Sequence, residues 1–407
     1  MSDLNELLAD IGDRARIYDV TEQALVRGRR RRTRHRAAFA VTTGAVAVTA
    51  LLVAVNLPFA GPAPEPAITP SPSPSAVALS ACTVAELPTP DGVRPGEFQG
   101  AAGDPTGRIL ASRGRGPVGP VVVIWTDGRP SGVVAVPETV DGVTAVSTTG
   151  ALVLSGRQAK DGRGEVRYTS LAWVYRNGVL TRLKGTDAHG SGINAAGAIV
   201  GLVGKDPVVW QDATAEPVRL PKPAGSTGEG TMAIADDGSV VAPLNQGGHT
   251  RLQLWPPGAP PRPLELPATI DGIAVLDSYG GRIADGWISG TIEARTETTV
   301  HRYAARWRLD TGKIEWSAGP GDATTTNPQA SNPQGWAVYR GTTGLILARG
   351  QTSVAVPAPP GFTSTAENFL DWPRVSVISS DGRTLAGNQM TVAQGVPARR
   401  VLSWTCR

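Results

Sequence analysis

The feature that most constrains this chain is a weak repeat that runs through residues 82–407. Each copy has a polar turn, a glycine and a short run of residues with high strand propensity, as in "INAAGAIVGLV" and "ISSDGRTLAGN". Successive turn glycines are 43, 47, 41, 48, 49 and 47 residues apart: Gly107, Gly150, Gly197, Gly238, Gly286, Gly335 and Gly382. A period of roughly 40–50 residues with strand content alone is typical of a β-propeller with one four-stranded blade per repeat. The repeat therefore predicts an all-β, seven-bladed propeller over residues 81–407.

Within each repeat, the glycine supplies the positive φ of a tight hairpin turn. A fourth strand that ends in Leu-Pro or Val-Pro fits an outer edge, where proline is tolerated. The third strand of six repeats is expected to end in a tryptophan that packs between blades: Trp125, Trp173, Trp210, Trp255, Trp307 and Trp404. The sixth repeat lacks this tryptophan and the fifth is longer. An eight-bladed or broken-blade arrangement therefore stays open.

The two cysteines, Cys82 and Cys406, lie at opposite ends of the repeat region. The last repeat stops after its third strand, whereas residues 82–90 carry the Leu-Pro ending of a fourth strand and follow no blade. Pairing these two fragments closes the ring and removes its open edge. It also places Cys82 beside Cys406, where a disulfide would persist outside the cytoplasm. Two free thiols are the alternative.

The segment before the propeller predicts a membrane anchor. Residues 37–60 carry no charge, and we expect a transmembrane helix over 37–57 followed by a Pro/Ser-rich linker over 58–80. The arginines immediately before it place residues 1–36 in the cytoplasm and the propeller outside the plasma membrane. A cleaved secretory signal and a buried globular helix are the alternatives. The arginines that set topology and bind anionic lipid are Arg29, Arg30, Arg31, Arg32, Arg34 and Arg36.

The cytoplasmic tail carries an amphipathic helix signature. Leu4, Leu7, Leu8 and Ile11 recur at helical spacing, so they form an apolar face with nothing of its own to pack against. This face could dock a cytoplasmic protein through residues 3–27, as in an anti-sigma-like regulator, or lie on the inner leaflet. A frayed tail is the alternative.

The sequence shows no local signature of catalysis. No nucleophile elbow, Walker loop or zinc spacing occurs, and the Asp-Gly pairs fit turns better than calcium loops. We therefore expect no catalytic residue, metal or cofactor, and a protein that is not an enzyme. Residues 37–407 contain 30 Lys+Arg and 29 Asp+Glu (39 − 9 and 35 − 6), so nucleic acid is not an expected partner. The alternative is a lyase or hydrolase that gathers its site from several blades at the channel mouth.

The segment "INAAGAIVGLVGKDPVVWQDATAEPVRLP" (193–221) resembles the repeat of HAF-repeat and WD40-like propeller proteins. The order of tail, arginine cluster, span and propeller resembles an actinobacterial membrane-protein layout. The resemblance implies a fold and a compartment, and it implies no activity, since propellers host many functions. The expected role is to bind or sense an unknown protein or cell-envelope ligand, with a signal relayed to the cytoplasm.

Overall fold

The computed structural model describes one of the two compact units of the chain, Ser73–Arg407. In the described part of that unit no helix is long and apolar enough to cross a membrane. The predicted tail face (Leu4, Leu7, Leu8, Ile11), the arginine cluster and the span over 37–57 lie outside the described residues. The structure describes residues 79–160, 167–321, 327–341, 344–360, 362, 373–393 and 396–407.

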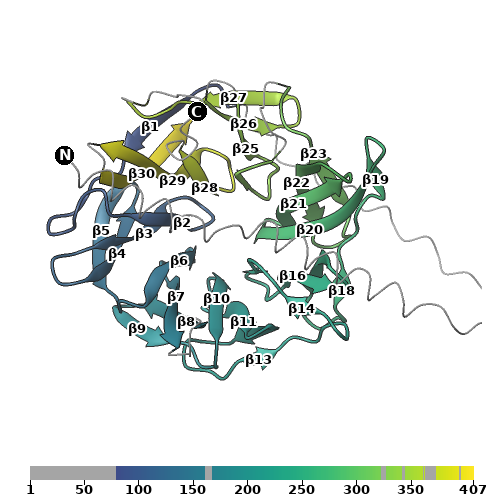
Figure 1. Ribbon diagram of the computed structural model, residues 1–407, viewed down its shortest axis with the longest axis horizontal. Coiled ribbons are helices and arrows are strands. Elements are labelled where there is room, and N and C mark those ends of the chain that lie inside the picture. The colour runs from purple at the N-terminus through teal and green to yellow at the C-terminus, as the bar shows by residue number, and fades with distance from the viewer. Residues whose placement is uncertain are drawn as a thin grey trace, which may run out of the picture. The chain divides into compact units, whose positions relative to one another are not determined.

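Seven antiparallel sheets form the blades of a propeller around a central channel, as Figure 1 shows. In blades 1–3 the strands follow chain order from the channel outward. Blade 1 holds β2 (Gln99–Gly103), β3 (Ile109–Arg115), β4 (Pro120–Thr126) and β5 (Arg129–Ala135). Blade 2 holds β6 (Val140–Val146), β7 (Leu152–Lys160), β8 (Arg167–Arg176) and β9 (Val179–Arg182). Blade 3 holds β10 (Ala188–Ile193), β11 (Ile199–Val203), β12 (Asp206–Trp210) and β13 (Val218–Arg219).

Blades 4 and 5 each have one additional short strand. Blade 4 holds β14 (Thr227–Gly228) and β15 (Ala233–Ile234), which both pair with β16 (Val240–Gln246), then β17 (His249–Trp255) and β18 (Arg262–Pro263). Blade 5 holds β19 (Thr269–Ile270), β20 (Ile273–Ala284), β21 (Trp287–Arg295), β22 (Val300–Arg308) and β23 (Ile314–Ser317). Blade 6 holds β24 (Ala330–Ser331), β25 (Ala337–Arg340), β26 (Leu345–Arg349) and β27 (Thr352–Val356).

Blade 7 closes the ring with strands from both ends of the repeat region. Its order is β28 (Arg374–Ile378), β29 (Thr384–Ala393), β30 (Val396–Cys406) and then β1 (Cys82–Glu86) as the outer strand. The register places Cys82 opposite Cys406, and a disulfide joins them. The predicted seven blades, the closing strand and the disulfide are thus confirmed, and the eight-bladed alternative is wrong.

The repeated turn has the geometry that its glycine requires. All seven turn glycines have φ between 74° and 94°, a region that other residues rarely adopt. In blades 3 and 6 an asparagine in this turn also ties neighbouring blades together. The Asn194 amide donates to the Ala235 carbonyl (3.1 Å), and the Asn332 amide donates to the Ser379 carbonyl (2.7 Å). The repeated turn therefore sets both the hairpin and the contact to the next blade.

The third-strand tryptophans lie between blades, as predicted. Each faces the preceding blade, and in five blades the indole Nε1 donates to a backbone carbonyl just past the fourth strand of that blade. The bonds run from Trp125 to Pro88 (2.8 Å), Trp210 to Lys184 (2.9 Å), Trp255 to Pro221 (2.7 Å), Trp307 to Glu265 (2.8 Å) and Trp404 to Pro357 (2.8 Å). Trp173 packs between blades 1 and 2 without such a bond in the described part of the chain. A buried ring and a fixed donor therefore join successive blades.

The seven clusters of buried apolar side chains correspond to the seven interfaces between blades. The interface of blades 5 and 6 is the poorest, with five buried residues and no tryptophan: Ala304, Ala337, Tyr339, Ile346 and Ala348. Ala348 pairs with Ala337, two residues after the turn glycine. Trp210, Trp255 and Trp307 pair with the residues at the same offset in blades 3, 4 and 5. Ala348 thus occupies the tryptophan position of blade 6.

Replacing both cysteines, Cys82→Ser with Cys406→Ser, should lower the free energy of unfolding by up to about 5 kcal/mol, because the disulfide spans 324 residues. Chemical denaturation of wild type with and without reductant measures this loss. The double variant is the control, since reductant should not change its midpoint. Alkylation of both cysteines in unreduced, folded protein would contradict the disulfide.

Trp210→Phe should cost about 1 kcal/mol or more, because it leaves the Lys184 carbonyl without its indole donor. Trp173→Phe is the control, since it removes an indole from the third strand of blade 2, where the described residues show no such bond. Thermal unfolding of the two variants provides the comparison. Equal losses would mean that the hydrogen bond adds nothing to ring packing.

Candidate functional site

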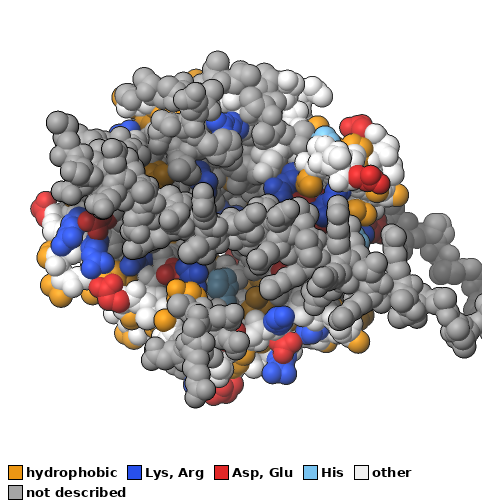
Figure 2. All heavy atoms as spheres, viewed as in Figure 1, with side chains coloured by type: hydrophobic (Ala, Val, Ile, Leu, Met, Phe, Trp, Pro, Cys, Tyr) orange, Lys and Arg blue, Asp and Glu red, His pale blue; other side chains and the backbone are white. Residues whose placement is uncertain are grey.

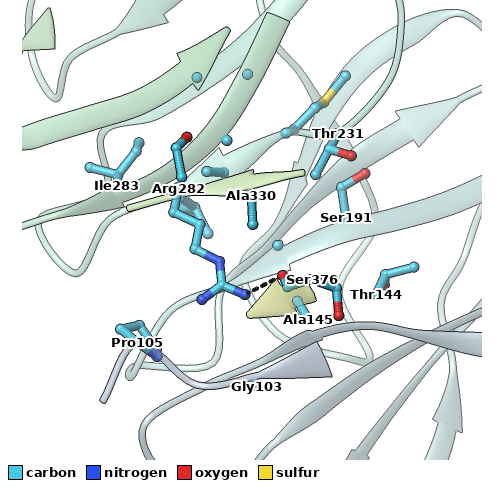
Figure 3. Close-up of a pocket in the computed structure, with 18 of the residues that line it drawn as sticks. Gly103, Pro105, Thr144, Ala145, Ser191, Thr231, Arg282, Ile283, Ala330 and Ser376 are labelled. Atoms are coloured by element: carbon cyan, nitrogen blue, oxygen red, sulfur yellow. Dashed lines mark hydrogen bonds between the residues drawn. The ribbon is translucent and has the colours of Figure 1, made fainter. Parts of the chain in front are cut away.

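The central channel holds a cavity of about 360 Å³ to which all seven blades contribute. Its wall comes mostly from the innermost strands and the residues beside them, so residues far apart in the sequence meet there (Figure 3). The lining includes Gly103, Thr144, Ser191, Thr231, Arg282, Ser331 and Ser376. This is the place where a propeller can assemble a site without leaving a local motif.

Small residues keep this channel open and let its strands approach closely. A Cβ on Gly281 would lie 2.4 Å from the Ser289 carbonyl oxygen, and a Cβ on Gly192 would lie 3.0 Å from the Met232 carbonyl oxygen. The first distance is closer than real Cβ contacts, and the second is at their lower limit. These glycines are therefore part of the wall and cannot be replaced without moving neighbouring backbone.

A backbone irregularity in blade 5 sets the position of the one cationic side chain in the cavity wall. The register of β20 against β21 shifts between Gly280 and Ile283, so the segment that carries Arg282 is bulged. Bulges redirect side chains and are frequent next to functional sites. The Arg282 backbone N–H donates to the Ser289 hydroxyl (3.2 Å), which holds the bulge in place. Figure 3 shows the Arg282 side chain extending across the channel.

The Arg282 guanidinium reaches from blade 5 to the first strand of blade 7. Its two terminal nitrogens donate to the carbonyls of Ser376 and Ile378, both at a long 3.4 Å. In the described part of the chain no carboxylate lies within ion-pair distance of it. Burial lowers the pKa of this guanidinium, and the more distant Asp104 carboxylate acts in the opposite direction. Arginine stays charged throughout the physiological range, so the channel holds a cation without a counter-ion.

Hydroxyl groups from several blades surround this cation. Thr144 donates to the Gly190 carbonyl (2.9 Å) and Ser376 donates to the Ala101 carbonyl (2.7 Å), so these hydroxyls are held by neighbouring first strands. Each keeps acceptor capacity for a ligand. Further hydroxyls in the lining belong to Ser191, Thr231, Thr291 and Ser331. The channel therefore offers one cation and many small hydrogen-bonding groups.

One mouth of the channel is formed by the repeated turns and holds a second cavity of about 470 Å³. Its acidic side chains are engaged in the protein: Asp236 accepts from the Ala195 N–H (2.8 Å) and Asp285 accepts from the Gln334 amide (3.2 Å). Within the described ranges no group of three or more His, Cys, Asp or Glu side chains is arranged to hold a metal ion. The acidic side chains at this mouth therefore stabilise the turns through hydrogen bonds within the protein.

A charged cluster lies at the end of blade 5 away from that mouth. The Glu293 carboxylate is 1% exposed and forms ion pairs with Arg295 (3.0 Å) and Arg302 (2.5 Å). Asp277, also buried, accepts from the Thr250 N–H (2.7 Å). His249 is half-exposed, with its Nδ1 3.6 Å from an Asp277 carboxylate oxygen. The cluster thus sets a histidine beside a fixed carboxylate, the arrangement that orients an imidazole as a base.

The residues singled out from the sequence mostly lie away from the cavity. Cys82 and Cys406 are on the outer strands of blade 7, and of the seven turn glycines Gly286 lines the mouth. His189 lies on the first strand of blade 3, and burial lowers its pKa. Sequence reasoning missed Arg282, whose only signal was the pair of glycines before it in a first-strand segment.

Charged side chains of both signs are interspersed on the face shown in Figure 2. This agrees with the near balance of the propeller, where 30 basic residues after position 36 meet 29 acidic ones (39 − 9 and 35 − 6). A charged ligand therefore meets mixed charges on this face, in contrast to the single cation in the channel.

No protein family and no curated protein matches the sequence. Solved structures resemble it in fold. Oligogalacturonate lyase from Vibrio parahaemolyticus is 12% identical, over 78% of this chain and 93% of the lyase, with a TM-score of 0.49. A gluconolactonase from Xanthomonas campestris is 14% identical, over 81% of this chain and 97% of that enzyme, with a TM-score of 0.37. An acylaminoacyl peptidase is 13% identical, over 74% of this chain and 51% of the peptidase, with a TM-score of 0.46.

These comparisons correct one expectation from the sequence, that the chain is not an enzyme. The three solved propellers named above are enzymes, and a site gathered from several blades leaves no local motif. The expectation rested on the lack of such motifs and is wrong. At this identity the likeness shows the fold alone, so it assigns no reaction to this chain.

Proposed function

We propose that the propeller binds a ligand that carries a carboxylate and several hydroxyl groups, such as an acidic saccharide of the cell envelope, in its central channel. The observation that carries this proposal is the Arg282 guanidinium, held in the channel at long distance from two carbonyls and without a carboxylate partner. A ligand carboxylate would supply the counter-ion, and charge-assisted bonds are the strong ones. The hydroxyl-lined wall suits the rest of a saccharide.

The setting we propose for this binding is the outer face of a cell membrane. The arginine cluster, the uncharged segment 37–57 and the linker 58–80 support an anchored chain with its propeller outside. The Cys82–Cys406 disulfide supports the same compartment, since disulfides persist under oxidising conditions. A relay to a cytoplasmic protein through residues 3–27 is part of this proposal. The proposed actinobacterial origin of the chain and its likeness to HAF-repeat proteins rest on the sequence alone.

Arg282→Gln should weaken binding of D-glucuronate by tenfold or more, because a hydrogen bond to a charged group contributes about 1.5–3 kcal/mol. Isothermal titration of the full chain with D-glucuronate and with D-glucose measures the effect of the carboxylate directly. The matched control Arg129→Gln removes an arginine from the outer strand of blade 1 and should change nothing. Equal binding of the two sugars by wild type, or equal glucuronate binding by Arg282→Gln, would overturn the proposal.

A lyase or hydrolase that acts on such a ligand is a second candidate function. The observation in its favour is the pair of His249 and Asp277, in which the carboxylate is held by the Thr250 N–H and lies beside the imidazole. That pair can orient a general base at a half-exposed position.

For this second function we expect His249→Gln to lower turnover by about 10²–10⁴-fold, the usual effect of losing a general base. A screen of uronate-containing oligosaccharides and chromogenic esters, run on wild type and variant, provides the measurement. His301→Gln, on β22 of blade 5, is the control, since His249 lies on β17 of blade 4. If His249→Gln and His301→Gln retain equal activity, His249 is not the general base.

A further inference from the structure

A cavity of about 350 Å³ lies between residues of blades 5 and 6, whose interface lacks a third-strand tryptophan. The side chains of β26 that face blade 5 are Ile346 and Ala348. Ala348 occupies the register position that a tryptophan has in blades 3, 4 and 5. The cavity is lined by the end of β22, by the outer strand β23 and by residues around Arg349. Its size is in the range of small-molecule sites, about 300–1,000 Å³.

A second cavity of about 550 Å³ adjoins the first and shares Trp316, Ser317 and Gly350 with it. Gly319 lies two residues past the end of β23 and lines this second cavity. At four of the other interfaces, the carbonyl that accepts the indole N–H lies at this same offset from the fourth strand. The cavities thus reach the place where a ring donor is bonded elsewhere in the propeller.

Polar groups at these cavities are not all satisfied within the protein. Arg306 is engaged: it forms an ion pair with Glu315 and its guanidinium lies 4.1 Å from the Trp287 ring. Arg349, in contrast, has no ion pair in the described part of the chain. Its pKa is lowered by burial and by the charge of Arg306, while Glu315 acts in the opposite direction. Two guanidinium groups and one carboxylate leave the cavity with a net positive charge.

Tyr339 adds a buried donor beside the cavities. Its side chain is 1% exposed, and its hydroxyl makes no hydrogen bond of normal geometry within the described residues. Burial raises the pKa of Tyr339 to about 12, against the opposing effect of Ser317 and the Ala304 backbone, which lie near the hydroxyl in poor hydrogen-bond geometry. Its ring would lie 2.9 Å from a Cβ on Gly319, which keeps the cavity wall free of side chains there.

The apolar surface at these cavities suits a flat ring. Trp316 is 45% exposed and borders both cavities, which is unusual for so large an apolar side chain. Every interface except this one holds an indole against the preceding blade. At this interface the buried aromatic ring is the phenol of Tyr339, which lies against Gly319, and Trp316 is left exposed at the cavities.

We propose that the interface of blades 5 and 6 is a binding site for a small aromatic carboxylate. The ring packs against the exposed Trp316 side chain, and the carboxylate pairs with Arg349. The site is separate from the channel at Arg282 and does not depend on the function proposed for it.

Titration calorimetry of the full chain tests this site with indole-3-acetate, indole and acetate as probes. Wild type should bind indole-3-acetate at one site, at least tenfold more tightly than indole. Arg349→Gln should reduce indole-3-acetate binding to the level of indole. Trp316→Ala should reduce binding of indole-3-acetate to the level of acetate, because it removes the ring that borders both cavities. Arg129→Gln is the control and should bind as wild type does.

Several results would overturn the proposal. They are the absence of binding by wild type, equal binding of indole-3-acetate and acetate, or unchanged binding by Arg349→Gln. Unchanged binding by a folded Trp316→Ala variant would place the ligand elsewhere. If Trp316→Ala does not fold, as judged by circular dichroism, the comparison of Arg349→Gln with the probe series still decides the question. A loss of binding in Arg282→Gln would assign the probe to the channel.

Discussion

The structure depends on one strand pairing that joins the two ends of the repeat region. β30 has β1 on its outer side, and without β1 the last blade would present an unpaired edge. A channel exists only while the ring is closed. Arg282 illustrates this: it is carried by blade 5 and bonds to carbonyls of blade 7, across a space that an open ring would not define. The geometry of the candidate site thus depends on closure of the propeller by β1 as much as on any single blade.

Between blades, the recurring element is a tryptophan ring that is both packed and bonded. The ring fills the space against the preceding blade, and its N–H satisfies a carbonyl that would otherwise be left at the end of a strand. Because a packed ring occurs at six interfaces, and its hydrogen bond at five of them, the one interface without a ring of this kind stands out. Blades 5 and 6 meet through alanines and one tyrosine, and cavities remain there. The interface between blades 5 and 6 is therefore packed less well than the other interfaces of the propeller.

Much of this fold follows from the sequence, because each blade repeats the same turn and the same pattern of strand packing. Glycines at a spacing near 47 residues, tryptophans at strand ends and two incomplete fragments predict blade number, interface packing and closure. The candidate site does not follow in the same way. Arg282 depends on a register shift in β20, which is a property of strand pairing and has no periodic signal. His249 and Asp277 are 28 positions apart on different blades, so their approach depends on how two blades pack.

The origin of β1 has a consequence for biogenesis. In a chain made from its N-terminus, β1 precedes its partner β30 by more than 300 residues. At about 5–20 residues per second, the two strands appear roughly 15–60 s apart. During that interval β1 is a strand without a sheet, and six blades can form while the seventh cannot. The strand is five residues long and carries the charged Glu86, features that oppose pairing with other chains. Closure of the propeller is thus delayed until β30 has been synthesised.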